Sequence, residues 1–167
     1  VNANVLTVRT RAVDVIAALN FSYWVFKERA QLLRYFRNAR RALTRDGILV
    51  LDAFGGYEAF REMRERTVHR GFTYVWHQAS YKPVTGHLLC HIHFRFPDGS
   101  RLDRAFTYDW RLWTLPELRE LLAEAGFRRV TVYWEGDDGQ GGGNGEFEPS
   151  AEGEADGGWI AYLVAER

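Results

Sequence analysis

The stretch that decides the fold runs from Val13 to Trp24 and reads VDVIAALNFSYW. It opens as an almost unbroken apolar run, the pattern of a strand covered by helices on both faces of a parallel sheet. The run changes to polar and aromatic residues at Asn20, where such a strand would end. Ligands of open α/β sheets bind outside the carboxyl ends of the strands. Residues 20–24 are therefore expected to stand at a binding site.

A second buried strand follows at the distance expected for a βαβ unit. A basic amphipathic helix is predicted from Lys27 to Leu43, and Ile48–Phe54 reads as the next strand. The crossover in such a unit is right-handed in nearly all proteins. Both strands should therefore present their polar and aromatic ends, near Asn20 and Asp52, to one crevice.

Three blocks of sequence resemble the second half of a class I S-adenosylmethionine-dependent methyltransferase: VDVIAALNFSYW, RDGILVLDAFGG and RLWTLPELRELLAEAGFRRVTVYW. The likeness covers Asn4 to about Glu135 and resumes from Trp159 to Arg167. The glycine-rich turn that cradles the cofactor in this family is missing before Val13. The resemblance implies an α/β fold, a truncated Rossmann-like sheet with helices on its faces, in a single partial domain over residues 1–167.

The same resemblance implies a function and a set of site residues. It implies S-adenosylmethionine as the cofactor and a small molecule as the methyl acceptor. The implied cofactor contacts are Asn4, Val5, Leu19, Asn20 and Phe21. The implied substrate contacts are Tyr23, Phe54, Tyr108, Arg111 and Trp113. Because the glycine-rich turn is missing, we expect the chain alone to bind the cofactor poorly and to be inactive.

The composition fits a single globular domain. The chain has 167 residues, rich in aromatic side chains, with six Trp and eight Tyr. It contains no apolar run long enough to cross a membrane. Cys90 is the only cysteine, which excludes an internal disulfide framework and favours a cytoplasmic location. The first residue is Val1 rather than Met, so we interpret the chain as a fragment.

The charges are unevenly distributed although the net charge is zero. Acidic residues without any Lys or Arg occupy the segment from Glu135 to Gly157, which leaves the remainder basic. This basic surplus raises the alternative of an RNA methyltransferase, and the arginines on the predicted Lys27–Leu43 helix could form a phosphate-binding face. No aromatic residues alternate with these arginines, so a solvated helix face is the favoured interpretation and nucleic acid is not an expected partner.

Alternating apolar residues predict three antiparallel strands at Phe72–Tyr81, His87–Phe96 and Arg101–Trp113. The turn sequences between them are typical of hairpins. We expect a three-stranded flap over the crevice, inserted at about residues 70–113, similar to the flap of many small-molecule methyltransferases. A short helix is predicted just before it, at Tyr57–Arg66.

His87, His91 and His93 share one face of the middle flap strand. A His-x-His pair on a strand can bind a metal. No further ligand has a sequence context that completes the set, so we interpret these residues as solvent-facing or pocket-rim histidines and expect no metal.

The C-terminal part shows clear helix and strand signals. Thr114 and Glu117 form a capping box sequence, which predicts a helix that stops at Gly126. Arg128–Trp134 and Trp159–Ala165 read as strands, antiparallel neighbours in the family that the chain resembles. The acidic, glycine-rich residues 136–158 between them are expected to form a flexible loop.

The N-terminal residues determine whether the predicted strand at Val13–Leu19 has a neighbour along both of its edges. Ala3–Val8 reads as a short strand, and we expect Val1–Val8 to be poorly anchored. The strand at Val13–Leu19 would then have one bare apolar edge, which could pair with a second chain in a homodimer. A non-catalytic, methyltransferase-like module remains the alternative to an enzyme.

Overall fold

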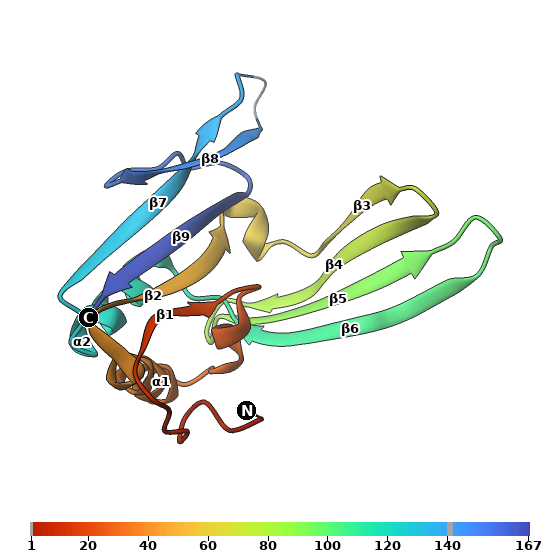
Figure 1. Cartoon of the computed structure of the whole chain (residues 1–167). Helices are drawn as coiled ribbons and strands as arrows, with labels where there is room; N and C mark the ends of the chain where they lie inside the picture. The colour runs from red at the N-terminus through yellow and green to blue at the C-terminus, as the bar shows by residue number, and fades with distance from the viewer. Residues whose placement is uncertain (1, 140–141) are drawn as a thin grey trace.

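Two sheets make up the chain, which is described by a computed structural model over residues 2–139 and 142–167. The first, sheet A, has five strands in the order β1-β2-β9-β7-β8, and the second, sheet B, has four in the order β3-β4-β5-β6. Sheet B extends away from sheet A as a twisted arm (Figure 1). Of the described residues, no helix is long and apolar enough to cross a membrane.

The elements follow one another along the chain with short connections. The strands are β1 (Val13–Ala18), β2 (Leu43–Gly55), β3 (Met63–His69), β4 (Phe72–Lys82), β5 (His87–Arg95), β6 (Arg101–Arg111), β7 (Arg129–Asp137), β8 (Gly143–Ser150) and β9 (Trp159–Glu166). The helices are α1 (Arg29–Ala42) and α2 (Leu115–Glu124), with single 3₁₀ turns η1 (Ser22–Val25) and η2 (Tyr57–Phe60).

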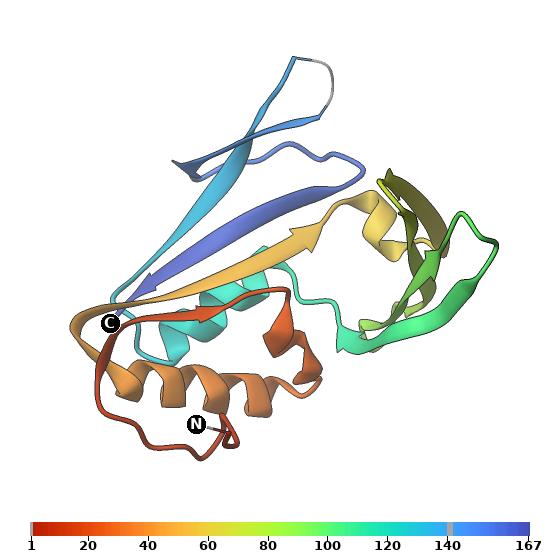
Figure 2. The same ribbon diagram turned by 45° about the vertical axis from the view of Figure 1, so that its right-hand side comes forward.

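The centre of sheet A contains the βαβ unit and the antiparallel C-terminal pair of strands that were expected from the sequence. β1 and β2 run parallel, and α1 connects them as the crossover. β9 lies antiparallel between β2 and β7, paired with both of them along most of its length. The ends of β1 and β2 consequently meet at the same edge of the sheet, beside the root of sheet B (Figure 2).

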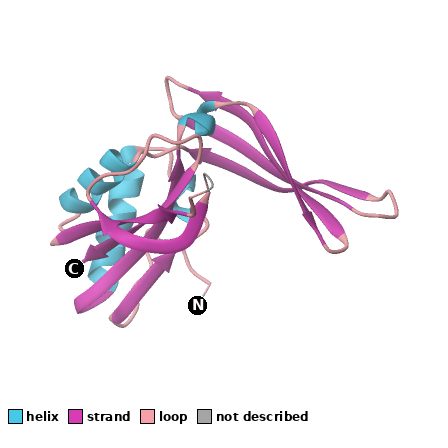
Figure 3. Ribbon diagram, turned by 90° about the horizontal axis from the view of Figure 1, so that it is seen from above, coloured by secondary structure: helices cyan, strands magenta, loops and turns pink. Residues whose placement is uncertain are grey.

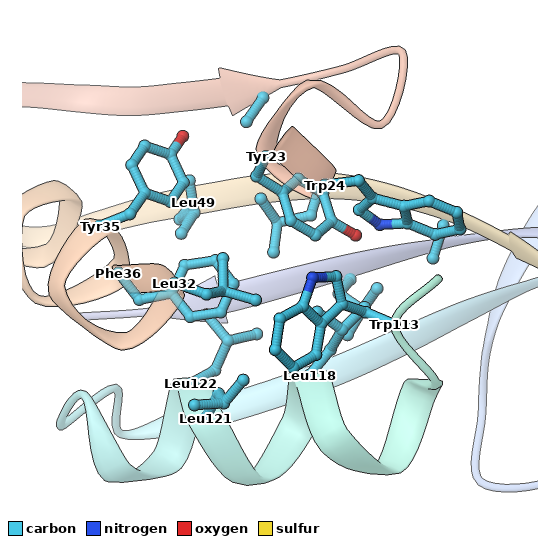
Figure 4. Close-up of a cluster of buried hydrophobic side chains, with 14 of the residues drawn as sticks. Tyr23, Trp24, Leu32, Tyr35, Phe36, Leu49, Trp113, Leu118, Leu121 and Leu122 are labelled. Carbon is cyan, nitrogen blue, oxygen red and sulfur yellow. The ribbon is translucent and has the colours of Figure 1, made fainter. Parts of the chain in front are cut away.

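Both helices pack on the same face of sheet A, where they contact each other (Figure 2). The core between this face and the helices contains Leu49 of β2, apolar side chains from both helices, and the rings of Tyr23 and Trp24 (Figure 4). Leu51 of β2 belongs to the same core. Burying large apolar side chains in this way is the main stabilising contribution to the fold.

The other face of β1 is more open than the sequence predicts. Val13, Val15 and Leu19 are 40%, 57% and 44% exposed, although the apolar run indicated cover on both faces. Within the described residues, β1 pairs only with β2, so its second edge has no strand neighbour. Pairing of this edge with a second chain stays a prediction.

Sheet B contains the three predicted flap strands and one more. β3 pairs antiparallel with β4, so the expected three-stranded flap is a four-stranded sheet that begins at Met63 (Figure 3). The predicted helix at Tyr57–Arg66 is wrong beyond its first turn. η2 ends at Phe60. The residues from Met63 onward form strand β3 instead, in which successive side chains point to opposite faces of the sheet.

The N-terminal residues do not form the predicted strand. Ala3–Val8 contains a turn, in which the backbone N–H groups of Thr7 and Val8 donate to the carbonyl oxygen of Asn4. Asn38 of α1 holds this turn, since its side-chain nitrogen donates to the carbonyl oxygen of Val5 at 2.7 Å. The segment therefore lies against α1 and adds no strand to sheet A. Val1, part of the segment expected to be poorly anchored, lies outside the described residues.

The acidic, glycine-rich segment is partly ordered into a strand. Residues Gly143–Ser150 form β8, which pairs antiparallel with β7 at the edge of sheet A. The predicted loop at 136–158 is therefore wrong over these residues, because backbone pairing does not require a large apolar side-chain surface. Residues 140–141 of that segment lie outside the described residues.

The capping box before α2 is present as predicted. The backbone N–H of Glu117 donates to Oγ1 of Thr114, and the Glu117 carboxylate accepts from the backbone N–H of Thr114 at 2.9 Å. Replacing Thr114 by Ala removes the cap, and we expect unfolding free energy to fall by about 1 kcal/mol. Urea unfolding followed by circular dichroism measures the change. The control is Thr10→Ala in the exposed coil before β1, and an equal effect of both changes would contradict the role of the cap.

Candidate functional site

The turn after β1 has an unusual backbone that a single carboxylate holds in place. Asn20 and Phe21 have φ angles of 56° and 53°, in the left-handed region that favours glycine. The backbone N–H groups of Asn20 and Phe21 donate to the two carboxylate oxygens of Asp52, at 2.7 and 2.9 Å. The end of β1 is thus fixed to the end of β2.

Asp52 is buried, with only 8% of its surface exposed. Burial raises the pKa of this carboxyl group, and the N–H donors of Phe21 and Asn20 oppose that rise because they stabilise the charged form. The hydroxyl of Tyr23 donates to the carbonyl oxygen of Asp52 at 2.7 Å, and burial raises the pKa of Tyr23 so that it stays protonated. Asp52 therefore organises the whole turn through both its side chain and its backbone.

The ring of Phe21 joins the two sheets. Its centroid lies 4.9 Å from Phe54 at the end of β2 and 5.9 Å from Trp110 of β6. Trp76 of β4 lies 6.4 Å from both Phe54 and Trp110, and the ring of Tyr108 stacks on Trp110 at 4.4 Å. These contacts form a continuous aromatic cluster from the end of β1 to the root of sheet B.

A cavity of about 540 Å³ opens beside this cluster. Its walls come from Phe21, Phe54 and η2 on the side of sheet A and from β3 and β4 on the side of sheet B. Gln78 fixes η2 against β4, because its side-chain nitrogen donates to the carbonyl oxygens of Glu58 and Arg61 at 2.9 and 2.8 Å. The cavity therefore lies where the ends of the parallel strands meet the arm.

Close packing of Gly55 and Trp159 shapes one end of the cavity. The two residues are directly opposite each other on β2 and β9, and both line the cavity. A Cβ atom placed on Gly55 would overlap the indole ring of Trp159. Glycine at this position allows the indole to lie flat across the neighbouring strand.

The structure brings together only some of the predicted cofactor residues. Leu19, Asn20 and Phe21 lie consecutively at the end of β1, and Phe21 lines the cavity. Asn4 and Val5 belong instead to the N-terminal turn, which Asn38 holds against α1.

The predicted substrate residues are spread over several environments. Phe54 lines the cavity, and Tyr108 lies behind its Trp76 wall. Tyr23 and Trp113 are core residues, each only 1% exposed, and Nε1 of Trp113 donates to the carbonyl oxygen of Phe26 at 3.1 Å. Arg111 stacks on the ring of Trp113 and lines a separate cavity of about 600 Å³.

The sequence predictions did not select three residues of the candidate site: Trp76 and Glu65, which line the cavity, and Asp52, which holds the turn beside it. Asp52 had a usable signal, because it is an acid at the end of a buried strand next to the predicted crevice. Trp76 was assigned to the flap without a role, and Glu65 fell within the predicted helix that is in fact β3. The wrong helix therefore hid one wall of the cavity.

A second cluster of polar residues lies on the opposite face of sheet B from the aromatic cluster. Nδ1 of His77 lies 3.3 Å from Nε2 of His93, and Nδ1 of His91 lies 2.9 Å from the hydroxyl of Thr107. His91 and His93 are buried rather than solvent-facing. No group of three His, Cys, Asp or Glu side chains in the described part of the chain has the geometry to hold a metal ion.

Similarity to known proteins is found in the structure of the chain and not in its sequence. No protein-family model matches the sequence, and no curated protein matches it either. Solved structures do match. A S-adenosylmethionine-dependent methyltransferase from Clostridium acetobutylicum superposes with a TM-score of 0.67 at 13% identity, over 98% of this chain. The chain has a class I methyltransferase fold.

Two further methyltransferase structures show the same arrangement. An amino pentose methyltransferase of calicheamicin biosynthesis from Micromonospora echinaspora, with bound S-adenosylmethionine, matches 99% of the chain with a TM-score of 0.63 at 14% identity. A sugar N-methyltransferase from Streptoalloteichus matches 99% with a TM-score of 0.59 at 19% identity. The chain spans 62%, 63% and 60% of the lengths of these three methyltransferases, about three fifths in each case.

The Asp52 contacts can be tested by a minimal substitution in this methyltransferase fold. An Asn at position 52 offers one acceptor oxygen in place of two, so one of the N–H groups of Asn20 and Phe21 loses its partner. We expect Asp52→Asn to lower the unfolding free energy by about 1–3 kcal/mol. The control is Asp46→Asn, exposed on the same strand. Equal unfolding free energies for the two variants, measured in urea, would show that the carboxylate does not hold the turn.

The histidine cluster predicts a pH dependence of stability. Burial lowers the pKa of His77 and His91, and the positive charges of Arg64 and Arg104 lower it further. In the unfolded chain both imidazoles would have a pKa of about 6.5. At pH values between the lowered pKa of the folded state and the pKa of the unfolded state, the unfolded chain binds more protons than the folded one. The free energy of unfolding should therefore decrease as the pH falls through this range.

Urea unfolding at a series of pH values measures this effect. Between pH about 7 and about 5, the free energy of unfolding should decrease less in the double variant His77→Gln, His91→Gln than in the unmodified chain. His69→Gln at the exposed end of β3 is the control. An unchanged pH dependence in the double variant would mean that other groups cause it.

Proposed function

We propose that this chain forms the acceptor-binding part of an enzyme that transfers a methyl group from S-adenosylmethionine to a small molecule. The observation that carries the proposal is the aromatic-walled cavity at the ends of β1 and β2, enclosed by the arm of sheet B. Open α/β sheets bind their ligands at this edge. Its volume of about 540 Å³ is in the range of small-molecule sites.

The end of β1 is suited to contact the methionine part of the cofactor. The backbone N–H groups of Asn20 and Phe21 are already bonded to Asp52, but the side chain of Asn20 is exposed and makes no hydrogen bond among the described residues. An amide can both donate and accept, as an amino acid group requires. We leave Asn4 and Val5, which are held against α1, out of the proposed contacts.

S-adenosylmethionine would supply a methyl group on a positively charged sulfur. The Phe21 ring can face that charge, because the negative face of an aromatic ring attracts cations. The rings of Phe54 and Trp76 would exclude water and orient the acceptor, and alignment of the reacting atoms is the main requirement of such a transfer. Asp52 acts as a positioning residue, since it fixes the turn that carries Asn20 and Phe21.

Substitution of Trp76 separates the acceptor side from the cofactor side. In the protein that contains this chain, Trp76→Ala should raise KM for the acceptor about tenfold, because a large apolar wall of the site is lost. The affinity for S-adenosylmethionine should change little. Transfer of a labelled methyl group to a panel of small amines and alcohols measures the first quantity, and calorimetric titration the second.

The matched control is Phe106→Ala, another aromatic residue of sheet B that is 54% exposed and outside the cavity. Equal losses of cofactor and acceptor binding in Trp76→Ala would argue against the assignment of the cavity to the acceptor. A protein that binds S-adenosylmethionine and methylates no acceptor would support the alternative, a non-catalytic binding module.

A further inference from the structure

The described lining of the cavity contains three acidic side chains and no basic one. The acidic residues are Glu58, Glu65 and Glu135, and none of the described lining residues is Lys, Arg or His. The arginines nearest in sequence to Glu65 are Arg64 and Arg66, and alternation along β3 directs them to the opposite face of sheet B. An acidic lining of this kind favours a positively charged ligand over a neutral or negative one.

The three carboxylates are not equally available. Glu58 forms an ion pair with Arg61 at 3.0 Å, and Glu135 accepts from the backbone N–H of Gly145 at 3.0 Å. The side-chain carboxylate of Glu65 makes no hydrogen bond or ion pair with any other described residue. It lies directly opposite Trp76 in the β3–β4 ladder, so both side chains are on the cavity face. Glu65 is therefore the carboxylate that can bind a ligand.

The aromatic walls next to Glu65 suit the same ligand chemistry. The ring of Phe54 is nearly perpendicular to those of Phe21 and Trp76, at interplanar angles of 74° and 88°. Rings arranged in this way present both faces and edges to a shared space, and ring faces attract ammonium groups. Tyr74 also lines the cavity, one cross-strand position further along the arm.

We propose that the acceptor bound in this cavity carries a protonated amine, which Glu65 and the faces of Trp76 and Phe54 recognise. This inference rests on the proposed function, because it names the chemical class of the acceptor for the same site. It concerns recognition of the charged group, whichever atom of the acceptor receives the methyl group.

The experiment uses two probes of the same size and shape, cyclohexylamine and cyclohexanol, titrated calorimetrically into the chain without S-adenosylmethionine. At neutral pH the amine is protonated and the alcohol is neutral. We expect the amine to bind about tenfold more tightly than the alcohol, a preference within the range of cation–π and charge-assisted contacts. Added salt should reduce the preference, because it screens the carboxylate.

Glu65→Gln should remove the preference for cyclohexylamine and leave cyclohexanol binding unchanged. Glu65→Asp should retain part of the preference. Glu120→Gln, on the exposed face of α2, is the matched control for the loss of one negative charge. Thermal unfolding of each variant confirms that the fold is kept.

Equal affinity for the two probes, binding of neither, or a preference that survives Glu65→Gln would overturn the inference. Displacement of the amine by S-adenosylmethionine would also overturn it, because the sulfonium group of the cofactor would then be the cation in the cavity. The outcome is separable from that of the proposed function. An amine preference without any methyl transfer refutes only the enzyme, and methyl transfer without the preference refutes only the amine.

Discussion

Two backbone N–H groups share the buried carboxylate of Asp52, and the positions of the cavity walls follow from that pairing. Without an acceptor for both N–H groups, Asn20 and Phe21 would lose the hydrogen bonds that stabilise their left-handed backbone conformation. With it, the Phe21 ring is directed at Phe54 and Trp110. A polar interaction inside sheet A thus determines where sheet B can dock.

The junction of the two sheets combines apolar packing with a small number of directional bonds. The aromatic cluster provides ring contacts between the sheets, while Gln78 fixes η2 to β4 through two hydrogen bonds. Aromatic contacts alone tolerate sliding, whereas hydrogen bonds set a register. The arm is therefore held at its root, and further along β6 the side chains of Leu102 and Phe106 are exposed.

Periodic apolar patterns predicted much of this fold from the sequence. The parallel pair β1 and β2, the helices, the capping box at Thr114 and three strands of the arm were all anticipated, because each has a local signal. β3 was missed because its residues MRERTVH are mostly polar and exposed, so only pairing with β4 makes them a strand. Phe21 and Phe54, which the sequence placed at strand ends, do line the cavity, whereas the hydrogen bonds of Asp52 depend on a contact 32 residues away.

The packing of Gly55 against Trp159 has a consequence for the evolution of the fold. These positions lie more than a hundred residues apart in the sequence, yet any side chain at 55 would occupy the space of the indole. A larger residue at position 55 is therefore tolerated only after, or together with, a smaller residue at position 159. Related sequences should show the two positions changing as a pair, and this covariation would mark the same cavity wall in chains too divergent to align by identity.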